Sequence, residues 1–326
     1  MTRTLRRIGT LPRIGSVVAV LAMTLAAAAC GGNTSTTGTT AGAAKLSGAV
    51  AVDGSSTVAP LSKAAADIFR ETQPDVSVTV GTSGTGGGFE KFCKGETDIS
   101  DASRKIKDTE KEKCTAAGIN PSEFIVANDA LSVVVSKENT WATCLTTAQL
   151  KKIWDQGSTV NNWNQIDPAF PNEPLKLFGP GTDSGTFDFF TAAINGKEDQ
   201  SRADYTPSEN DNVIVQGVAG SKGGLGYFGF TYYEENKDKL NVVKVDSGGG
   251  CVEPSVASAQ DGTYKPLSRP LFIYVSNKSI SKPQVKGFVE FYVSSIDDIV
   301  TEAKFVPLTA TQKTTLAAEL ETLKKG

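Results

Sequence analysis

The sequence predicts an α/β fold with two lobes, each built on a mostly parallel central sheet flanked by helices. Short apolar segments alternate along the chain with segments whose apolar residues recur at helical spacing. Strands that alternate with helices favour parallel pairing. The 326 residues exceed what one domain core usually holds, and 39% hydrophobic with 21% charged residues is typical of a globular protein.

The first half of the folded part shows each of these patterns in turn. Residues 76–80 alternate Val-Ser-Val-Thr-Val as a half-buried strand does, whereas apolar residues of 60–72 recur at intervals of three and four. A short helix carries Phe89 and Phe92, and 98–104 forms a strand end and loop. Further strands are expected at 49–52, 124–127 and 131–135, and a helix opened by a threonine cap at 146–154.

The second half repeats the alternation. Strands are expected at 175–178, 226–230 and 271–275. Helices are expected at 187–194, 213–219, 285–294 and 311–323. We expect the chain to cross twice between lobes, so that 45–129 plus 268–326 form lobe 1 and 130–267 form lobe 2.

The N-terminal segment has the features of an export signal. Four arginines precede an apolar run that is too short to span a bilayer comfortably, so residues 1–29 are interpreted as a signal peptide. Small residues before Cys30-Gly-Gly resemble a bacterial lipoprotein cleavage site, with ordinary secretion as the alternative. Residues 30–44 then form a lipidated terminus and flexible tether. Removal of 1–29 would change the net charge from −3 to −7.

The cysteines fit an oxidising compartment. Apart from Cys30 there are four, which allow three pairings. Proximity in the sequence favours Cys93 with Cys114, which leaves Cys144 for Cys251. Free buried thiols are the alternative, and the absence of a C-x-x-C spacing argues against zinc.

The chain contains no histidine, which excludes Ser-His and Cys-His catalysis and histidine-ligated metals. We therefore expect a protein without enzymatic activity, cofactor or metal. A net charge of −3 makes a nucleic-acid partner unexpected.

Three loops rich in Ser, Thr and Gly each connect an expected strand to an expected helix. They are 54–57, 82–88 and 183–186. Helix N-termini present free N–H groups, glycine allows close backbone approach, and hydroxyl groups add uncharged donors. At the carboxyl ends of strands these loops can converge on one small oxyanion, although helix capping alone would explain any single loop. Arg104, at the end of an expected strand, could add a guanidinium fork.

Together these segments resemble the phosphate-binding proteins of Pst-type ABC transporters. The resemblance rests on Val52–Pro60, Gly81–Phe89, Gly95–Arg104, Asp183–Phe187 and Gly224–Gly229, and it covers nearly all of 48–326. It implies a type II periplasmic-binding-protein fold that closes on inorganic phosphate and delivers it to the permease subunits of an ABC transporter. The expected protein is a monomer, anchored to the outer face of the cell membrane through lipid on Cys30.

The resemblance carries the phosphate ligands over to particular residues. They are Ser55, Ser56, Thr57, Ser83, Ser103, Arg104, Ser184, Gly185 and Thr186. The family's arginine before the third loop is replaced by Pro180 and Gly181, so Arg104 is expected to supply that charge from the opposite lobe. The family's proton-accepting aspartate is replaced by Ser103, which leaves Asp53, Asp101 and Asp183 as candidates.

Three other functions stay open, and one of them is a sensor or adhesin that kept the fold and lost transport. A receptor for sulfate, molybdate or tungstate would use the same kind of cleft. A secreted Ser-Lys hydrolase would need a Ser-x-x-K pair, and Ser279 with Lys282 matches that spacing without a supporting motif.

Overall fold

The structure is a computed structural model that describes residues 45–182, 184–208 and 210–325. Residues Lys45–Gly326 form one compact unit. The α/β class is the one expected from the sequence. The export signal, Cys30 and the tether lie outside the described residues.

The strands form one branched sheet in the described part of the chain. Its main order is β2-β1-β3-β11-β4-β8-β6-β7, and β9 joins β4, β5 and β10. The bounds are β1 Gly48–Gly54, β2 Val76–Val80, β3 Ile99–Ala102, β4 Pro121–Ser136, β5 Cys144–Thr146, β6 Lys176–Gly179, β7 Thr206–Pro207, β8 Gly224–Gly229, β9 Leu240–Asp246, β10 Cys251–Val252 and β11 Ser268–Ser276.

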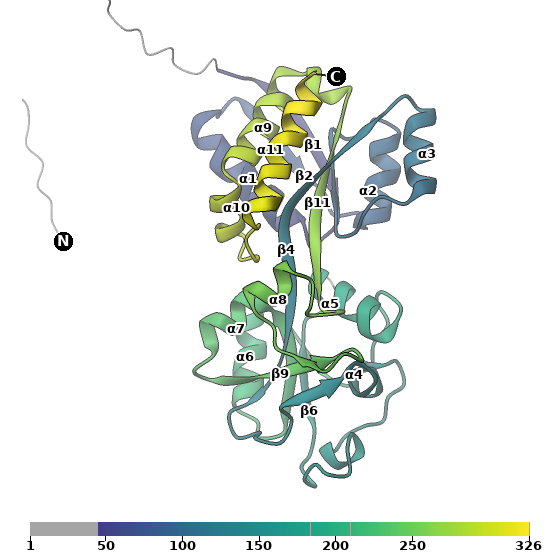
Figure 1. The fold of residues 1–326 in the computed structure, drawn as a ribbon, viewed down its shortest axis with the longest axis vertical. Coiled ribbons are helices and arrows are strands. Elements are labelled where there is room, and N and C mark those ends of the chain that lie inside the picture. Colours follow the sequence, from purple (N-terminus) through teal and green to yellow (C-terminus); the bar gives the residue numbers. More distant parts are fainter. Residues whose placement is uncertain (1–44, 183, 209, 326) are drawn as a thin grey trace, which may run out of the picture. The chain divides into compact units, whose positions relative to one another are not determined.

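The helices lie beside this sheet (Figure 1). The α-helices are α1 Ala59–Thr72, α2 Gly84–Cys93, α3 Asp108–Ala116, α4 Thr147–Trp154, α5 Gly185–Phe190, α6 Asp211–Ala219, α7 Phe230–Asn236, α8 Val256–Gln260, α9 Pro283–Ser294, α10 Ile296–Glu302 and α11 Ala310–Lys325. Single turns are η1 Trp163–Gln165, η2 Thr191–Asn195 and η3 Ser279–Ser281. No helix among the described residues is long and apolar enough to cross a membrane.

The long strands β4 and β11 run between the upper and lower groups of helices in Figure 1. The sequence predicted two strands, 124–127 and 131–135, where the structure has the single strand β4. The residues between the two predicted strands include the polar Asn128 and Asp129. Asn128 stays in the strand because its side-chain amide donates to Pro307 O at 3.0 Å and to Gln312, while Asp129 pairs with Arg269.

Strand pairing in the sheet is mixed rather than mostly parallel. β1 pairs in parallel with β2 and β3, and β6 pairs in parallel with β7 and β8. β4 pairs antiparallel with β11 over residues 121–130 and with β8 over 131–135. The parallel groups at the two ends of the sheet are therefore joined by an antiparallel centre.

The two largest of the four hydrophobic clusters among the described residues stabilise the halves on either side of this centre. In one, Phe69 of α1 packs on Phe288 of α9 at 5.4 Å between ring centroids. In the other, Phe190 stacks on Tyr227 at 3.8 Å and Trp154 contacts both rings edge-on. The first core anchors the helix that follows loop 54–57, and the second anchors the helix that follows loop 183–186.

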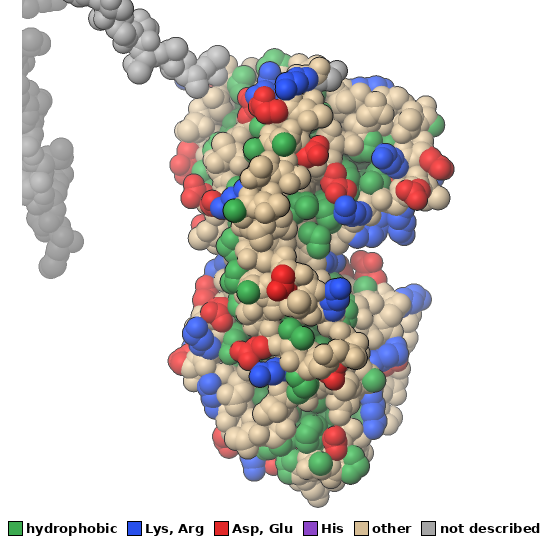
Figure 2. Space-filling view, viewed as in Figure 1, with side chains coloured by type: hydrophobic (Ala, Val, Ile, Leu, Met, Phe, Trp, Pro, Cys, Tyr) green, Lys and Arg blue, Asp and Glu red, His purple; other side chains and the backbone are tan. Residues whose placement is uncertain are grey.

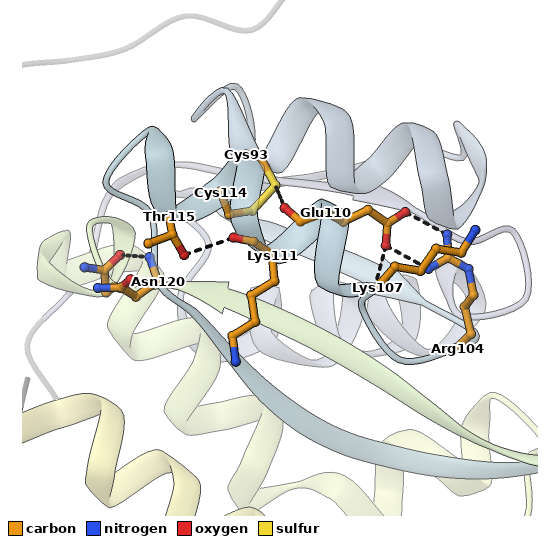
Figure 3. The surroundings of a disulfide bond; sticks show 9 residues. Cys93, Arg104, Lys107, Glu110, Lys111, Cys114, Thr115 and Asn120 are labelled. Carbon is orange, nitrogen blue, oxygen red and sulfur yellow. Dashed lines mark hydrogen bonds and ion pairs between the residues drawn. A yellow bond between two sulfur atoms is a disulfide. The ribbon is translucent and has the colours of Figure 1, made fainter.

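Both disulfides favoured by the sequence are present in the structure. Cys93–Cys114 joins α2 to α3 (Figure 3), and Cys144–Cys251 joins β5 to β10. Their sequence separations are 21 and 107 residues. The second therefore closes the much longer loop in the unfolded chain.

We expect the loss of the disulfide that closes the longer loop to lower the stability more than the loss of the other disulfide. In the chain-entropy model, Cys144→Ser with Cys251→Ser should lower the free energy of unfolding by about 4–5 kcal/mol. Cys93→Ser with Cys114→Ser should lower it by about 3 kcal/mol. Urea unfolding of both double variants and the oxidised wild type measures the difference. A larger loss from the Cys93–Cys114 variant would show that native contacts, rather than loop length, set the order.

Candidate functional site

The first polar loop turns the chain from β1 into α1. Gly54 has a φ of +148°, and a Cβ atom there would lie 2.1 Å from the carbonyl oxygen of Asp101. The N–H of Ser55 donates to the same carbonyl at 2.9 Å. These contacts hold the end of β1 against the end of β3. The first loop and the segment at Ser103 are consequently brought to one edge of the sheet.

The second loop is tied to the first through Asp53. Ser83 donates to Asp53 Oδ1 from its N–H at 2.9 Å and from its hydroxyl at 2.6 Å, and Lys91 donates to Oδ2 at 2.5 Å. Burial alone would raise the pKa of Asp53, but the hydrogen bonds from Lys91 and Ser83 lower it. Asp53 therefore remains an ionised carboxylate that positions the Ser83 loop.

The third loop contacts the first loop directly. The hydroxyl of Thr57 donates to the carbonyl oxygen of Gly185 at 3.0 Å, and the hydroxyl of Ser56 donates to Asp188 Oδ2 at 3.0 Å. A Cβ atom on Gly185 would lie 2.4 Å from Thr57 Oγ1. Ser184 caps its own helix by accepting from the N–H of Thr186 at 3.2 Å. Glycine at 185 thus permits the close approach of the two loops.

Most of the predicted site residues line one cavity of about 1160 Å³. These are Ser55, Ser56, Thr57, Ser83, Ser103 and Arg104. The other three, Ser184, Gly185 and Thr186, line a neighbouring cavity of about 990 Å³ that shares Ser56 and Thr57. Figure 2 shows a hollow on one side of the molecule, with Lys and Arg side chains on its upper edge and acidic side chains facing them below. The structure thus brings the first two loops together and places the third beside them.

Arg104 lines the cavity but already has a carboxylate partner. Its two terminal nitrogens donate to the two oxygens of Glu110 at 2.9 Å each, as Figure 3 shows. The Arg104 side chain is 35% exposed. Burial would raise the pKa of Glu110, but Arg104 outweighs it and holds that pKa low. An incoming anion therefore competes with Glu110 for this guanidinium.

A second arginine, Arg269, which the sequence did not single out, lines the same cavity as Arg104. Arg269 Nη2 donates to Thr57 Oγ1 at 3.1 Å and Nη1 donates to the carbonyl of Ser103 at 3.4 Å. Its guanidinium carbon lies 3.6 Å from the centre of the Phe189 ring. Only 18% of the Arg269 side chain is exposed. This buried cation contacts two of the segments that were predicted to hold an anion.

Arg269 is held in place by Asp129. The two residues face each other in the β4–β11 register, and Arg269 Nε lies 3.4 Å from Asp129 Oδ2. Burial raises the pKa of Asp129, and Arg269 offsets only part of that rise. Burial also lowers the pKa of Arg269, against the attraction of Asp129. A buried pair of this kind leaves the guanidinium with donors and positive field for a further anion.

The three candidate proton acceptors lie in different environments. Asp53 is occupied by Ser83 and Lys91, and Asp183 lies outside the described residues. Asp101 is fully buried, where Ser62 donates to it at 2.8 Å and burial raises its pKa to about 7. Asp101 is not among the residues that line the two cavities. Asp53 is thus taken up by its own partners, and the unpartnered Oδ2 of Asp101 is buried away from both cavities.

Asp188, which no sequence pattern singled out, lines the larger cavity. Burial and a hydrogen-bonding contact with Asp199 raise the pKa of Asp188 to about 7. Asp188 lies five residues after the start of the third loop, inside the helix expected at 187–194. A charged residue one turn after a Ser-Gly-Thr loop is the signal that could have found it.

The Ser279–Lys282 spacing does not form a catalytic pair in the structure. Lys282 Nζ donates to Asp98 Oδ1 at 2.8 Å, and Ser279 also hydrogen-bonds to Asp98. Neither residue lines the two cavities. Both side chains therefore hydrogen-bond to Asp98 at the end of the sheet.

The fold and cleft define a binding protein for a small oxyanion, and known proteins agree with that class. A sequence model of the PBP superfamily domain matches residues 36–295. Protein SphX of Synechococcus elongatus is 49% identical over 280 residues, covering 85% of this chain and 82% of SphX. Phosphate-binding protein PstS of Staphylococcus saprophyticus is 42% identical over 271 residues, covering 83% and 81% of the two chains.

A solved structure agrees as well. It is described as a possible phosphate binding protein from Planctomyces limnophilus, with a TM-score of 0.82 and 47% identity. The match covers 86% of this chain and 99% of that one. The chain belongs to the PBP superfamily, in the branch that contains SphX and PstS.

Proposed function

We propose that this chain is an extracytoplasmic phosphate receptor that captures inorganic phosphate in the cleft and delivers it to an ABC permease. The observation that carries the proposal is the cavity in which buried Arg269 meets hydroxyl groups from several loops. The phosphate binding named for the relative PstS and for the solved structure from Planctomyces limnophilus supports the choice of anion.

Local donors provide the binding energy in this mechanism. Arg269 supplies the main positive charge, and Ser55, Ser56, Thr57, Ser83 and Ser103 are the proposed uncharged donors. The hydroxyl hydrogens of Ser56, Thr57 and Ser83, which point to protein acceptors in the structure, would turn to the anion when it binds. Arg104 and the loop 184–186 complete the set. Because the chain is acidic overall, long-range attraction does not bring the anion in. Exclusion of water strengthens each short contact once the anion has entered.

Two lobes, 45–129 plus 268–326 and 130–267, are proposed to close on the ligand. The cavity of about 1160 Å³ is far larger than one inorganic anion, so the walls must approach each other to surround it. The contacts between Thr57 and Gly185 and between Ser56 and Asp188 join the proposed lobes. Closure around phosphate then provides the shape that a permease distinguishes from the free receptor.

We also propose how the receptor is held at the outer face of the membrane. Export through residues 1–29 and lipidation of Cys30 would anchor a monomer to the outer face of the membrane by the tether 30–44. The two disulfides are consistent with an oxidising location. Binding without catalysis, without a cofactor and without nucleic acid completes this proposal.

Calorimetry on ligand-stripped protein tests the function. We expect one phosphate to bind per chain, arsenate to compete with it, and sulfate to bind at least about 100-fold more weakly, since mismatched buried polar groups cost about 1–3 kcal/mol each. Tighter binding of sulfate, molybdate or tungstate would instead identify a receptor for that anion. Sustained turnover of phosphate monoesters or model esters would identify a hydrolase.

A further inference from the structure

The aromatic ring of Phe189 covers one face of the Arg269 guanidinium. The guanidinium carbon lies 3.6 Å from the centre of the ring, and both side chains line the larger cavity. The Phe189 side chain is buried. The face of an aromatic ring carries partial negative charge and attracts a cation, and the attraction is stronger where water is excluded. The contact between Phe189 and Arg269 is therefore electrostatic as well as apolar.

The N–H groups of Arg269 lie along the edge of the guanidinium, not on its face. Three of the five donate to polar partners, which are the Asp129 carboxylate, the Ser103 carbonyl and the Thr57 hydroxyl. A ring stacked on the face takes none of the remaining donors. Arg104 differs, because Glu110 holds it through N–H groups that an anion would need. Phe189 can therefore orient Arg269 without removing a hydrogen bond from a ligand.

The ring is fixed by helix α5, which lies in the other proposed lobe. Phe189 packs in the second hydrophobic core, and the next residue, Phe190, stacks on Tyr227 at 3.8 Å. Arg269, on β11, belongs to the proposed lobe 45–129 plus 268–326. The stacked pair thus spans the division between the proposed lobes, so separation of the lobes would withdraw the ring from the guanidinium.

We propose that Phe189 is a positioning residue for the anion, and that its ring holds the Arg269 guanidinium by the face so that the free N–H groups at the edge bind the ligand. A guanidinium whose orientation is already fixed loses less freedom when it forms hydrogen bonds, which favours binding. The inference rests on the proposed function, since it concerns the same cleft. Because Phe189 also fills volume in the second core, the test must separate its aromatic face from its apolar bulk.

Phe189→Leu removes the aromatic face and keeps an apolar side chain. We expect calorimetry on ligand-stripped protein to show about tenfold weaker phosphate binding, with recovery to within about threefold of the wild type in Phe189→Tyr. In Arg269→Ala, the further change Phe189→Leu should alter the affinity by less than about threefold, because the ring then has no cation to hold. Phe170→Leu is the matched control and should keep the wild-type affinity, because it makes the same change in the same core and Phe170 lines neither cavity.

A nuclear Overhauser measurement tests the contact in the wild type itself. In protein labelled selectively in arginine and phenylalanine, we expect cross-peaks between the side-chain protons of Arg269 and the ring protons of Phe189, both without phosphate and with it bound. The cross-peaks are assigned by their disappearance in Arg269→Lys. Their absence from the phosphate complex would overturn the proposal, whether or not the variants of Phe189 fold.

The outcomes separate this inference from the function on which it rests. A wild type that binds no phosphate overturns the proposed function. A wild type that binds phosphate, with Phe189→Leu folded and within about threefold of its affinity, overturns the role of Phe189 alone. An equal loss from Phe189→Leu with and without Arg269, or an equal loss from Phe170→Leu, does the same, because the ring would then act through packing. If Phe189→Leu does not fold, or if Arg269→Ala binds too weakly for the comparison, the Overhauser measurement decides.

Discussion

Replacing Arg269 with alanine is expected to weaken phosphate binding at least about 100-fold, since hydrogen bonds to charged groups contribute about 1.5–3 kcal/mol each. The guanidinium is mostly buried, lies against the ring of Phe189 and reaches both Thr57 and Ser103. Arg269→Lys should recover only part of the affinity, because an ammonium group cannot reproduce the planar fork. Phosphate titration by calorimetry measures both variants.

Arg104 provides the comparison for this experiment. Its guanidinium is bidentate to Glu110, so an anion gains less from it, and we expect Arg104→Ala to weaken binding about tenfold. Loss of Arg269 also leaves Asp129 without its partner in a buried position, which can cost about 3–5 kcal/mol of stability. Thermal unfolding must therefore accompany each titration. A larger loss of affinity from Arg104→Ala, with both variants folded, would assign the main charge to Arg104 instead.

Local structure could be predicted from the sequence because the spacing of apolar residues reflects which side chains are buried. The Val-Ser-Val-Thr-Val run of β2 has the predicted bounds, and Thr146 caps α4 as expected. The break predicted within β4 was wrong because Asn128 and Asp129 find partners on other elements. A polar residue inside an apolar run predicts a turn only when no distant group can form a hydrogen bond or ion pair with its side chain.

Separation along the sequence also explains which residues of the site were not predicted. Arg269 and Thr57 are 212 residues apart, and they meet because β3 pairs both with β1, which precedes Thr57, and with β11, which carries Arg269. No local spacing encodes such a meeting. An acid at the centre of one apolar strand and an arginine at the start of another could have suggested a buried pair. The three loops were found because each carries its own polar pattern, whereas the residues between them depend on the tertiary fold.

The loop 54–57 depends on a backbone contact that a single methyl group would prevent. In Gly54→Ala, the Cβ atom would collide with the Asp101 carbonyl, which is also the acceptor for the N–H of Ser55. The φ of +148° is strained for any side chain. We expect a loss of about 3 kcal/mol or more in the free energy of unfolding, from strain and overpacking together.

Gly157→Ala separates these two contributions. Gly157 has a φ of +80°, and a Cβ atom there would meet nothing within 4 Å. It should therefore cost only the strain of the left-handed conformation, about 1 kcal/mol in urea unfolding. Because the collision in Gly54→Ala displaces Ser55 and the end of β3, that variant should also lose phosphate affinity, while Gly157→Ala should keep it. Equal losses of stability in the two variants would mean that β3 moves aside at no cost in free energy. Contacts other than the junction of β1 with β3 would then position the loop 54–57.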